Sequence, residues 1–160
     1  MLIEIRRESF YSTSNETVGN MCFEPLISAY QTGMRRRNDQ DGQGFKKEFY
    51  ASLTKGQRAL FGFFTFYDHA VRSKEEFRHI AAQYLSDDIF LIVKKGAEFF
   101  QLESMQQLLS EIEQAFSKQN ATQDAQLDDL HSRFSEIAPF ALTNIGAFIK
   151  KNPDEFVVLL

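Results

Sequence analysis

The most apolar part of the chain lies near its middle, from Leu60 to Val71. Its apolar side chains would point to every side of a helix and do not form a single stripe. A helix with one apolar stripe lies on a surface, whereas a helix that is apolar all round must be covered on all sides. We therefore expect a central helix in the stretch 52–86, with the rest of the fold arranged around it.

Two capping patterns indicate where helices begin in this stretch. Thr54 and Gln57 have the spacing of a capping box, so the central helix is expected to begin at Lys55. Ser73 and Glu76 repeat the spacing, which predicts a break and a second helix there.

Apolar positions at helical spacing predict further helices on both sides of the central one. Asn20 is expected to cap a helix over about 21–37, where Pro25 is tolerated only near the start. Two acidic residues favour the beginning of a helix over about 87–101. Pro139 is expected to close one helix or to open the next.

The two ends of the chain differ from this helical pattern. Residues 1–11 alternate between apolar and polar, which predicts a short strand or extended arm. Residues 12–20 are small and polar and predict a loop, and residues 38–44 have the composition of a turn. The tail 156–160 is too apolar for a free end, so we expect it to pack on the domain or on a partner.

Taken together, the patterns predict an all-α fold of six or seven helices in one compact domain over residues 1–160. Residues 1–20 form the arm and loop, and residues 21–156 form the helical core. The 17 phenylalanines and the absence of tryptophan suit a dry helical core, because a phenylalanine ring has no polar atom to satisfy.

Composition also bears on location and chemistry. No apolar run approaches the roughly 18 to 20 residues that a membrane span needs, and the N-terminus has no signal-peptide hydrophobic region. The single cysteine, Cys22, cannot form an internal disulfide, which favours a cytoplasmic protein. We interpret Cys22 as a small buried residue and not as a catalytic thiol.

Charge is distributed unevenly along the chain, whose net charge is −4. Residues 1–96 carry 12 acidic and 14 basic side chains, whereas residues 97–160 carry 10 acidic and 4 basic ones. Little lysine or arginine is therefore available in the second half to neutralise its acids, which we expect to share a surface that attracts a basic partner. The expected partner-binding residues are Glu98, Glu103, Glu111, Glu113, Asp124, Asp128, Asp129 and Glu136.

Several short motifs lie between residues 52 and 156. Leu53-Thr54 and Gly56-Gln57-Arg58 stand at the start of the aromatic-rich helix, and another helix begins near Phe77. Towards the end of the chain the motifs are Asp128-Asp129-Leu130, Phe134, Ile149 and Asn152-Pro153-Asp154-Glu155-Phe156. In these motifs the chain resembles a bacterial family of small helical domains whose best-known member is an acidic DNA-mimic protein.

The resemblance implies a helical fold, a dimer and an acidic protein that occupies a DNA-binding partner. The family usually carries an Asn-Gly-Gly-Phe turn, whereas the matching stretch here, 73–77, shares only Phe77. A net charge of −4 is also modest for copying a phosphate backbone.

An alternative prediction is a metal site in a helical bundle. Glu76 and His79, and likewise Asp128 and His131, each place a carboxylate and an imidazole on one helical face. Asp68 and His69 lie on the preceding helix and could contribute to the same site. This alternative describes a metal-dependent helical-bundle enzyme, whereas ordinary surface ion pairs would explain the same spacings.

No other catalytic pattern is present. The sequence has no nucleophile elbow, Walker A motif or dinucleotide-binding glycine motif, and its pI of about 5.4 argues against direct nucleic-acid binding. The sequence therefore favours a non-enzymatic cytoplasmic protein-interaction module without a cofactor. Its acidic face would bind a basic protein, for example a DNA-binding protein. The sequence is also compatible with a homodimer.

Overall fold

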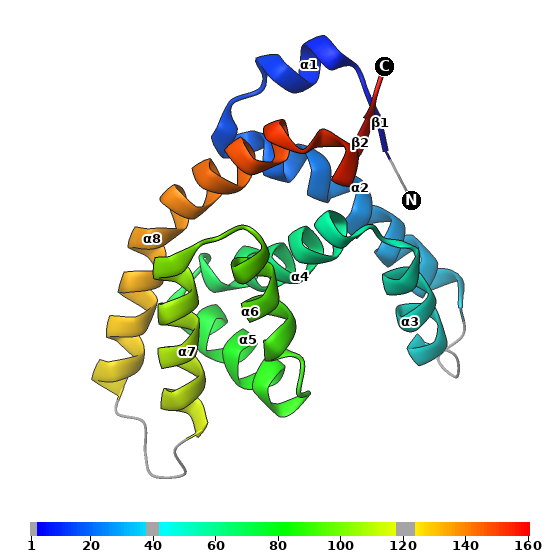
Figure 1. Cartoon of the computed structure of the whole chain (residues 1–160). Helices are drawn as coiled ribbons and strands as arrows, with labels where there is room; N and C mark the ends of the chain where they lie inside the picture. The colour runs from blue at the N-terminus through cyan, green and yellow to red at the C-terminus, as the bar shows by residue number, and fades with distance from the viewer. Residues whose placement is uncertain (1–2, 38–41, 118–123) are drawn as a thin grey trace.

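The computed structural model describes residues 3–37, 42–117 and 124–160, and the described part is an all-α fold with eight α-helices. The fold class is thus as predicted, with more helices than the six or seven expected. Figure 1 shows the two chain ends side by side, where two short strands pair. The elements are β1 (Ile3–Ile5), α1 (Arg7–Ser12), α2 (Asn15–Arg36), α3 (Gly42–Ser52), α4 (Lys55–Ala70), α5 (Lys74–Ser86), α6 (Phe90–Phe99), α7 (Glu103–Ser117), α8 (Asp124–Lys151), the 3-10 helix η2 (Pro153–Glu155) and β2 (Val157–Leu159).

Helix α4 is the central helix that the sequence predicts. Ten of its 16 residues are buried, and α2, α5 and α6 all pack against it. Its aromatic rings meet rings from elsewhere in the chain: Phe64 lies 5.3 Å from Phe23 of α2, and Phe66 lies 5.8 Å from Phe134 of α8 between ring centroids. The burial of the helix on several sides explains why apolar residues occur all round it.

The first turn of α4 is tied to the C-terminal tail. The capping box forms as predicted, with Thr54 and Gln57 each accepting from the other's backbone N–H. The buried Gln57 side chain also donates from Nε2 to the Phe156 carbonyl at 3.0 Å. The Gly56 N–H donates to the Glu155 carboxylate at 3.1 Å. The start of the central helix and the end of the chain therefore stabilise each other.

Gln57→Leu should lower the free energy of unfolding by about 1 to 3 kcal/mol, because it removes the buried donor to the Phe156 carbonyl and the capping acceptor of the Thr54 N–H. The exposed Gln107 of α7 offers a matched control, and Gln107→Leu should change stability by less than about 0.5 kcal/mol. Urea unfolding followed by circular dichroism measures both values. Equal stabilities for the two variants would contradict the proposed link.

The N-terminal prediction was wrong in two places. Residues 7–12 form helix α1 and not an extended arm, so the strand is confined to β1. The predicted loop 12–20 is largely helical, because α2 begins at Asn15 and Asn20 lies inside it. Pro25 consequently sits well inside α2, which continues because buried Val18, Cys22 and Leu26 extend one apolar stripe across the proline.

Pro139 also lies within a continuous helix, contrary to the expected break. Proline has no N–H, so the Ser135 carbonyl has no helical donor. Ser135 and Pro139 are both exposed, and water can therefore hydrate this carbonyl. Buried residues on both sides of the proline hold α8 against the core as one 28-residue helix: Leu127, Leu130, Phe134, Ala138, Ala141, Ile145 and Ile149.

Three further boundaries differ from the predictions. Helix α6 begins at Phe90 and not at residue 87, because Asp88 has a positive φ of 56° and belongs to the turn after α5. Gly42 to Gly44, expected in a turn, form the first residues of α3. The rest of that predicted turn, 38–41, lies outside the described residues.

The apolar tail packs on the fold, which is one of the two outcomes that its composition predicts. Phe156 and Val157 are buried, and β2 pairs in parallel with β1, with Ile3 opposite Val157. The Arg7 N–H extends the pairing by donating to the Leu160 carbonyl at 2.9 Å. None of the described helices combines the length and apolar character needed to cross a membrane.

Candidate functional site

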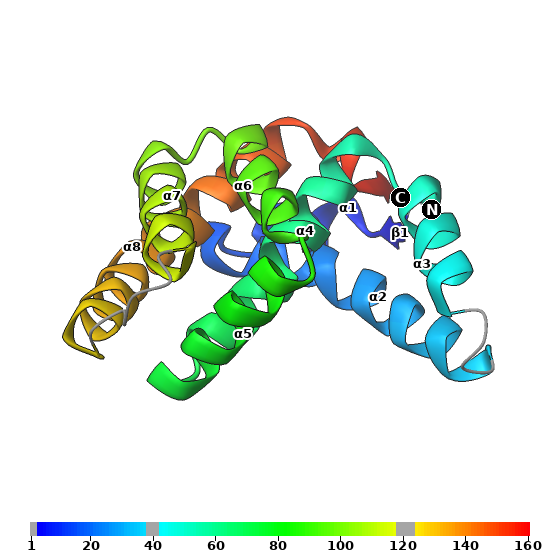
Figure 2. The ribbon, with the colours of Figure 1, turned by 90° about the horizontal axis from the view of Figure 1, so that it is seen from below.

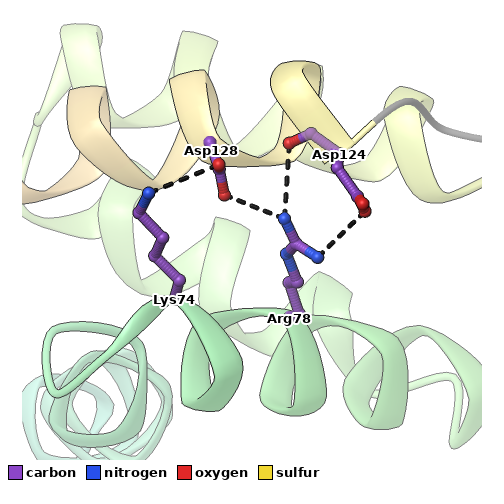
Figure 3. A network of polar contacts seen from close by, with 4 residues as sticks. All are labelled: Lys74, Arg78, Asp124 and Asp128. Carbon is purple, nitrogen blue, oxygen red and sulfur yellow. Dashed lines mark hydrogen bonds and ion pairs between the residues drawn. The ribbon is translucent and has the colours of Figure 1, made fainter.

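The acidic residues that the sequence singles out are spread over α6, α7 and α8, and basic side chains face several of them. Arg78 of α5 contacts two of these acids, Asp124 and Asp128 (Figure 3). Its Nη1 lies 3.0 Å from Asp124 Oδ1, and its Nη2 lies 2.8 Å from Asp128 Oδ1. Lys74 approaches the other carboxylate oxygen of Asp128 at 3.3 Å. The hydrogen bond from Arg78 lowers the pKa of Asp128, so this carboxylate is ionised and paired at neutral pH.

Three other acids are paired in the same way. Arg133 donates to both carboxylate oxygens of Glu111, at 2.5 and 3.1 Å, and lies 3.8 Å from Asp129. Lys94 of α6 lies 3.2 Å from Glu113. The expectation that few bases are available to neutralise these acids was therefore wrong. Lys74, Arg78 and Lys94 come from the first half of the chain, and the helical packing brings them to the second.

The other three predicted residues, Glu98, Glu103 and Glu136, are exposed and form no ion pair with a described residue. Glu103 lines a shallow hollow of about 200 Å³ together with Ile137 and Phe140 of α8. Glu136 precedes Phe140 by four residues, so both lie on one face of the helix.

Phe140 is the most exposed large hydrophobic residue in the described part of the chain, at 73%. The name "α7–α8 patch" is used below for Glu103, Glu136 and Phe140. The exposure of Phe140 was not predicted, because Pro139 was expected to close one helix or to open the next. On one continuous helix, Phe140 falls outside the buried stripe that passes through Ala138 and Ala141.

The structure does not bring the four predicted metal ligands together. Glu76 contacts His69 at 3.1 Å, whereas Asp128 is held by Lys74 and Arg78. His131 lies against the Phe77 ring, 5.3 Å between ring centroids. Across residues 3–37, 42–117 and 124–160, no group of three or more histidine, cysteine or acidic side chains could hold a metal ion.

The remaining predicted metal residues also have other surroundings. His79 lines a hollow on the surface of α5 together with Glu75 and Glu76. Burial raises the pKa of Asp68.

The second predicted capping box, at Ser73 and Glu76, forms on one side only. The Ser73 hydroxyl accepts a hydrogen bond from the Glu76 N–H at 3.1 Å, whereas the Glu76 side chain turns towards His69. The predicted second capping box is therefore only half formed.

Cys22 faces the core, where burial raises the pKa of its thiol to about 12. The thiol is thus protonated at neutral pH, whereas a nucleophilic cysteine needs a stabilised thiolate. Its position on α2 matches the interpretation of Cys22 as a buried packing residue.

No protein-family model matches this chain, and neither does any curated protein or solved structure. The resemblance to the DNA-mimic family consequently stays a prediction that rests on the short motifs between residues 52 and 156.

Proposed function

We propose that this protein is a non-enzymatic interaction module that binds a basic protein through the α7–α8 patch. The observation that carries the proposal is Phe140, whose ring is 73% exposed, lies beside Glu103 and shares a helical face with Glu136. Neither carboxylate forms an ion pair with a described residue. An aromatic anchor within a polar rim is the usual composition of a protein-binding site.

The pairing of the other acids sharpens the proposal. Asp124, Asp128, Glu111 and Glu113 already have basic partners on neighbouring helices, so their fields are largely compensated at a distance. The unpaired carboxylates keep their full charge and can steer a basic partner towards Phe140. Such steering weakens as salt shortens the Debye length to about 8 Å near physiological ionic strength.

The test begins with capture of a partner from cytoplasmic extract and continues with the purified pair. The triple variant Glu103→Lys, Glu136→Lys and Phe140→Ala should weaken binding about tenfold or more. The two charge reversals should mainly slow association, and the loss of the Phe140 ring should mainly speed dissociation. Surface plasmon resonance at several salt concentrations measures both rates.

A matched control reverses two glutamates and truncates one exposed apolar residue elsewhere: Glu8→Lys, Glu24→Lys and Leu91→Ala, which are exposed positions on α1, α2 and α6. This control should bind as the wild type does. Equal losses from both triple variants, or binding indifferent to both variants and to salt, would contradict the proposal. So would a homodimer that buries Phe140, which analytical ultracentrifugation with the Phe140→Ala variant would detect.

The resemblance adds one arm to this experiment. If the captured partner binds DNA, duplex DNA should compete with this protein for it, as expected of a mimic. A basic partner that binds the patch without such competition would support the interaction module and contradict DNA mimicry.

A further inference from the structure

A second concave surface lies away from the α7–α8 patch, between the α2–α3 hairpin and the helices α4, α5 and α6. Figure 2 shows the hairpin on one side and α5 and α6 on the other. The cleft has a volume of about 830 Å³. This volume falls within the range of small-molecule binding sites, roughly 300 to 1,000 Å³. We use the name "tyrosine cleft" for this space, which is lined by Tyr30, Gln43, Lys46, Lys47, Tyr50, Phe61, Gly62, Thr65, Tyr84, Asp87, Ile89 and Ile92.

The inner wall of the tyrosine cleft is apolar and aromatic. The Phe61 ring packs edge-on against Tyr30 and Tyr50, at 5.4 and 6.2 Å between ring centroids. Gly62 lets α4 approach α6 closely on this wall, because a Cβ at this position would lie 2.5 Å from Ile92 Cγ2 and 3.3 Å from the Tyr50 hydroxyl. A flat apolar group in the cleft would meet aromatic and aliphatic side chains, as is typical of small-molecule sites.

Two tyrosine hydroxyls at the wall, those of Tyr50 and Tyr84, are held by hydrogen bonds. Burial raises the pKa of Tyr50 to about 12, and its hydroxyl donates to the Arg58 carbonyl at 3.3 Å. Burial also raises the pKa of Tyr84, and a hydrogen bond with Thr65 partly offsets this rise. These hydroxyls are therefore neutral donors and acceptors at physiological pH.

The charges at the rim are separated. Lys46 and Lys47 stand on α3, are exposed, and form no ion pair with a described residue. Asp87, at the end of α5, is the acid that lines the cleft. A negatively charged group would be attracted towards α3 and repelled from the end of α5, which fixes the orientation of a ligand with one charged end.

We propose that the tyrosine cleft binds a small amphipathic anion, whose flat apolar body lies on Phe61 and Ile92 and whose charged group faces Lys46 and Lys47. This site is separate from the α7–α8 patch, and the proposal does not depend on the binding of a protein partner.

Two fluorescent probes that differ by one charged group test the proposal on the full chain. They are 1-anilinonaphthalene-8-sulfonate and its uncharged counterpart N-phenyl-1-naphthylamine. The wild type should bind the sulfonate saturably at one site, and more tightly than the uncharged probe, because only the sulfonate can use the two lysines. Chemical shifts of the Ile89 and Ile92 methyl groups should move on titration with either probe.

The variant Lys46→Glu with Lys47→Glu should weaken sulfonate binding about tenfold or more and change binding of the uncharged probe less than about twofold. The matched control Lys55→Glu with Lys95→Glu reverses two exposed lysines outside the cleft and should change neither. Asp87→Asn removes the repelling charge and should tighten sulfonate binding.

A third variant tests the location without changing charge. Gln43→Trp fills the cleft from an exposed position on α3 and should weaken both probes. Because dye also binds partly unfolded protein, each variant must first show the thermal midpoint of the wild type within a few degrees. Sulfonate binding that is absent, non-saturable, or unchanged by both the lysine reversal and Gln43→Trp would overturn the proposal.

Discussion

Replacing Phe64 with alanine should lower the free energy of unfolding by about 3 to 5 kcal/mol, the largest effect expected of any single truncation discussed for this protein. Phe64 has no exposed surface and lies in the middle of α4. Its ring packs against Phe23 of α2 and against Phe63 and Tyr67 of its own helix, at 5.3 to 6.0 Å between ring centroids. Truncation would therefore leave a cavity among rigid rings, which cannot collapse to fill it.

Phe140→Ala is the matched control, because it removes the same side chain from a position that is 73% exposed. It should change stability by less than about 0.5 kcal/mol. Chemical unfolding of the wild type and the two variants under one set of conditions measures the difference. A Phe64→Ala variant as stable as the Phe140→Ala variant would mean that α4 is not the centre of the core.

The sequence predicts the centre of this fold better than its ends. The apolar character of α4 and the capping box at Thr54 and Gln57 are local patterns, so both could be recognised without knowledge of the tertiary structure. Propensity was misleading at Pro25 and Pro139, where long-range packing of one stripe on the core outweighs the loss of a helical hydrogen bond.

The candidate site was less accessible to sequence reasoning. The acids could be identified, but their partners could not, because Arg78 reaches Asp124 and Asp128 across 46 and 50 residues of chain. The exposure of Phe140 depends on the continuity of α8 through Pro139. The tyrosine cleft combines residues from five helices, α2 to α6, and from the turn before α6, and no single segment carries its pattern.

Replacing Gly146 with alanine should destabilise the protein by about 1 to 3 kcal/mol or more, although alanine is the better helix former by about 1 kcal/mol. Helix α8 passes the start of α2 (Figure 1), and Gly146 of α8 lies against Asn15, the first residue of α2. A Cβ at this position would lie 1.8 Å from the carbonyl oxygen of Asn15 and 2.6 Å from its carbonyl carbon. Both atoms belong to the backbone, so no rotamer change relieves the clash and the helices must move apart.

Gly42→Ala provides the control, because the nearest atom to a Cβ there is the flexible Met34 Cε at 3.6 Å, an ordinary contact. It should change stability by no more than about 0.5 kcal/mol in either direction. Urea unfolding with both glycine variants separates steric overlap from helix propensity, since propensity alone would make both more stable. Stabilisation by Gly146→Ala would mean that α8 does not meet the α2 backbone at Asn15.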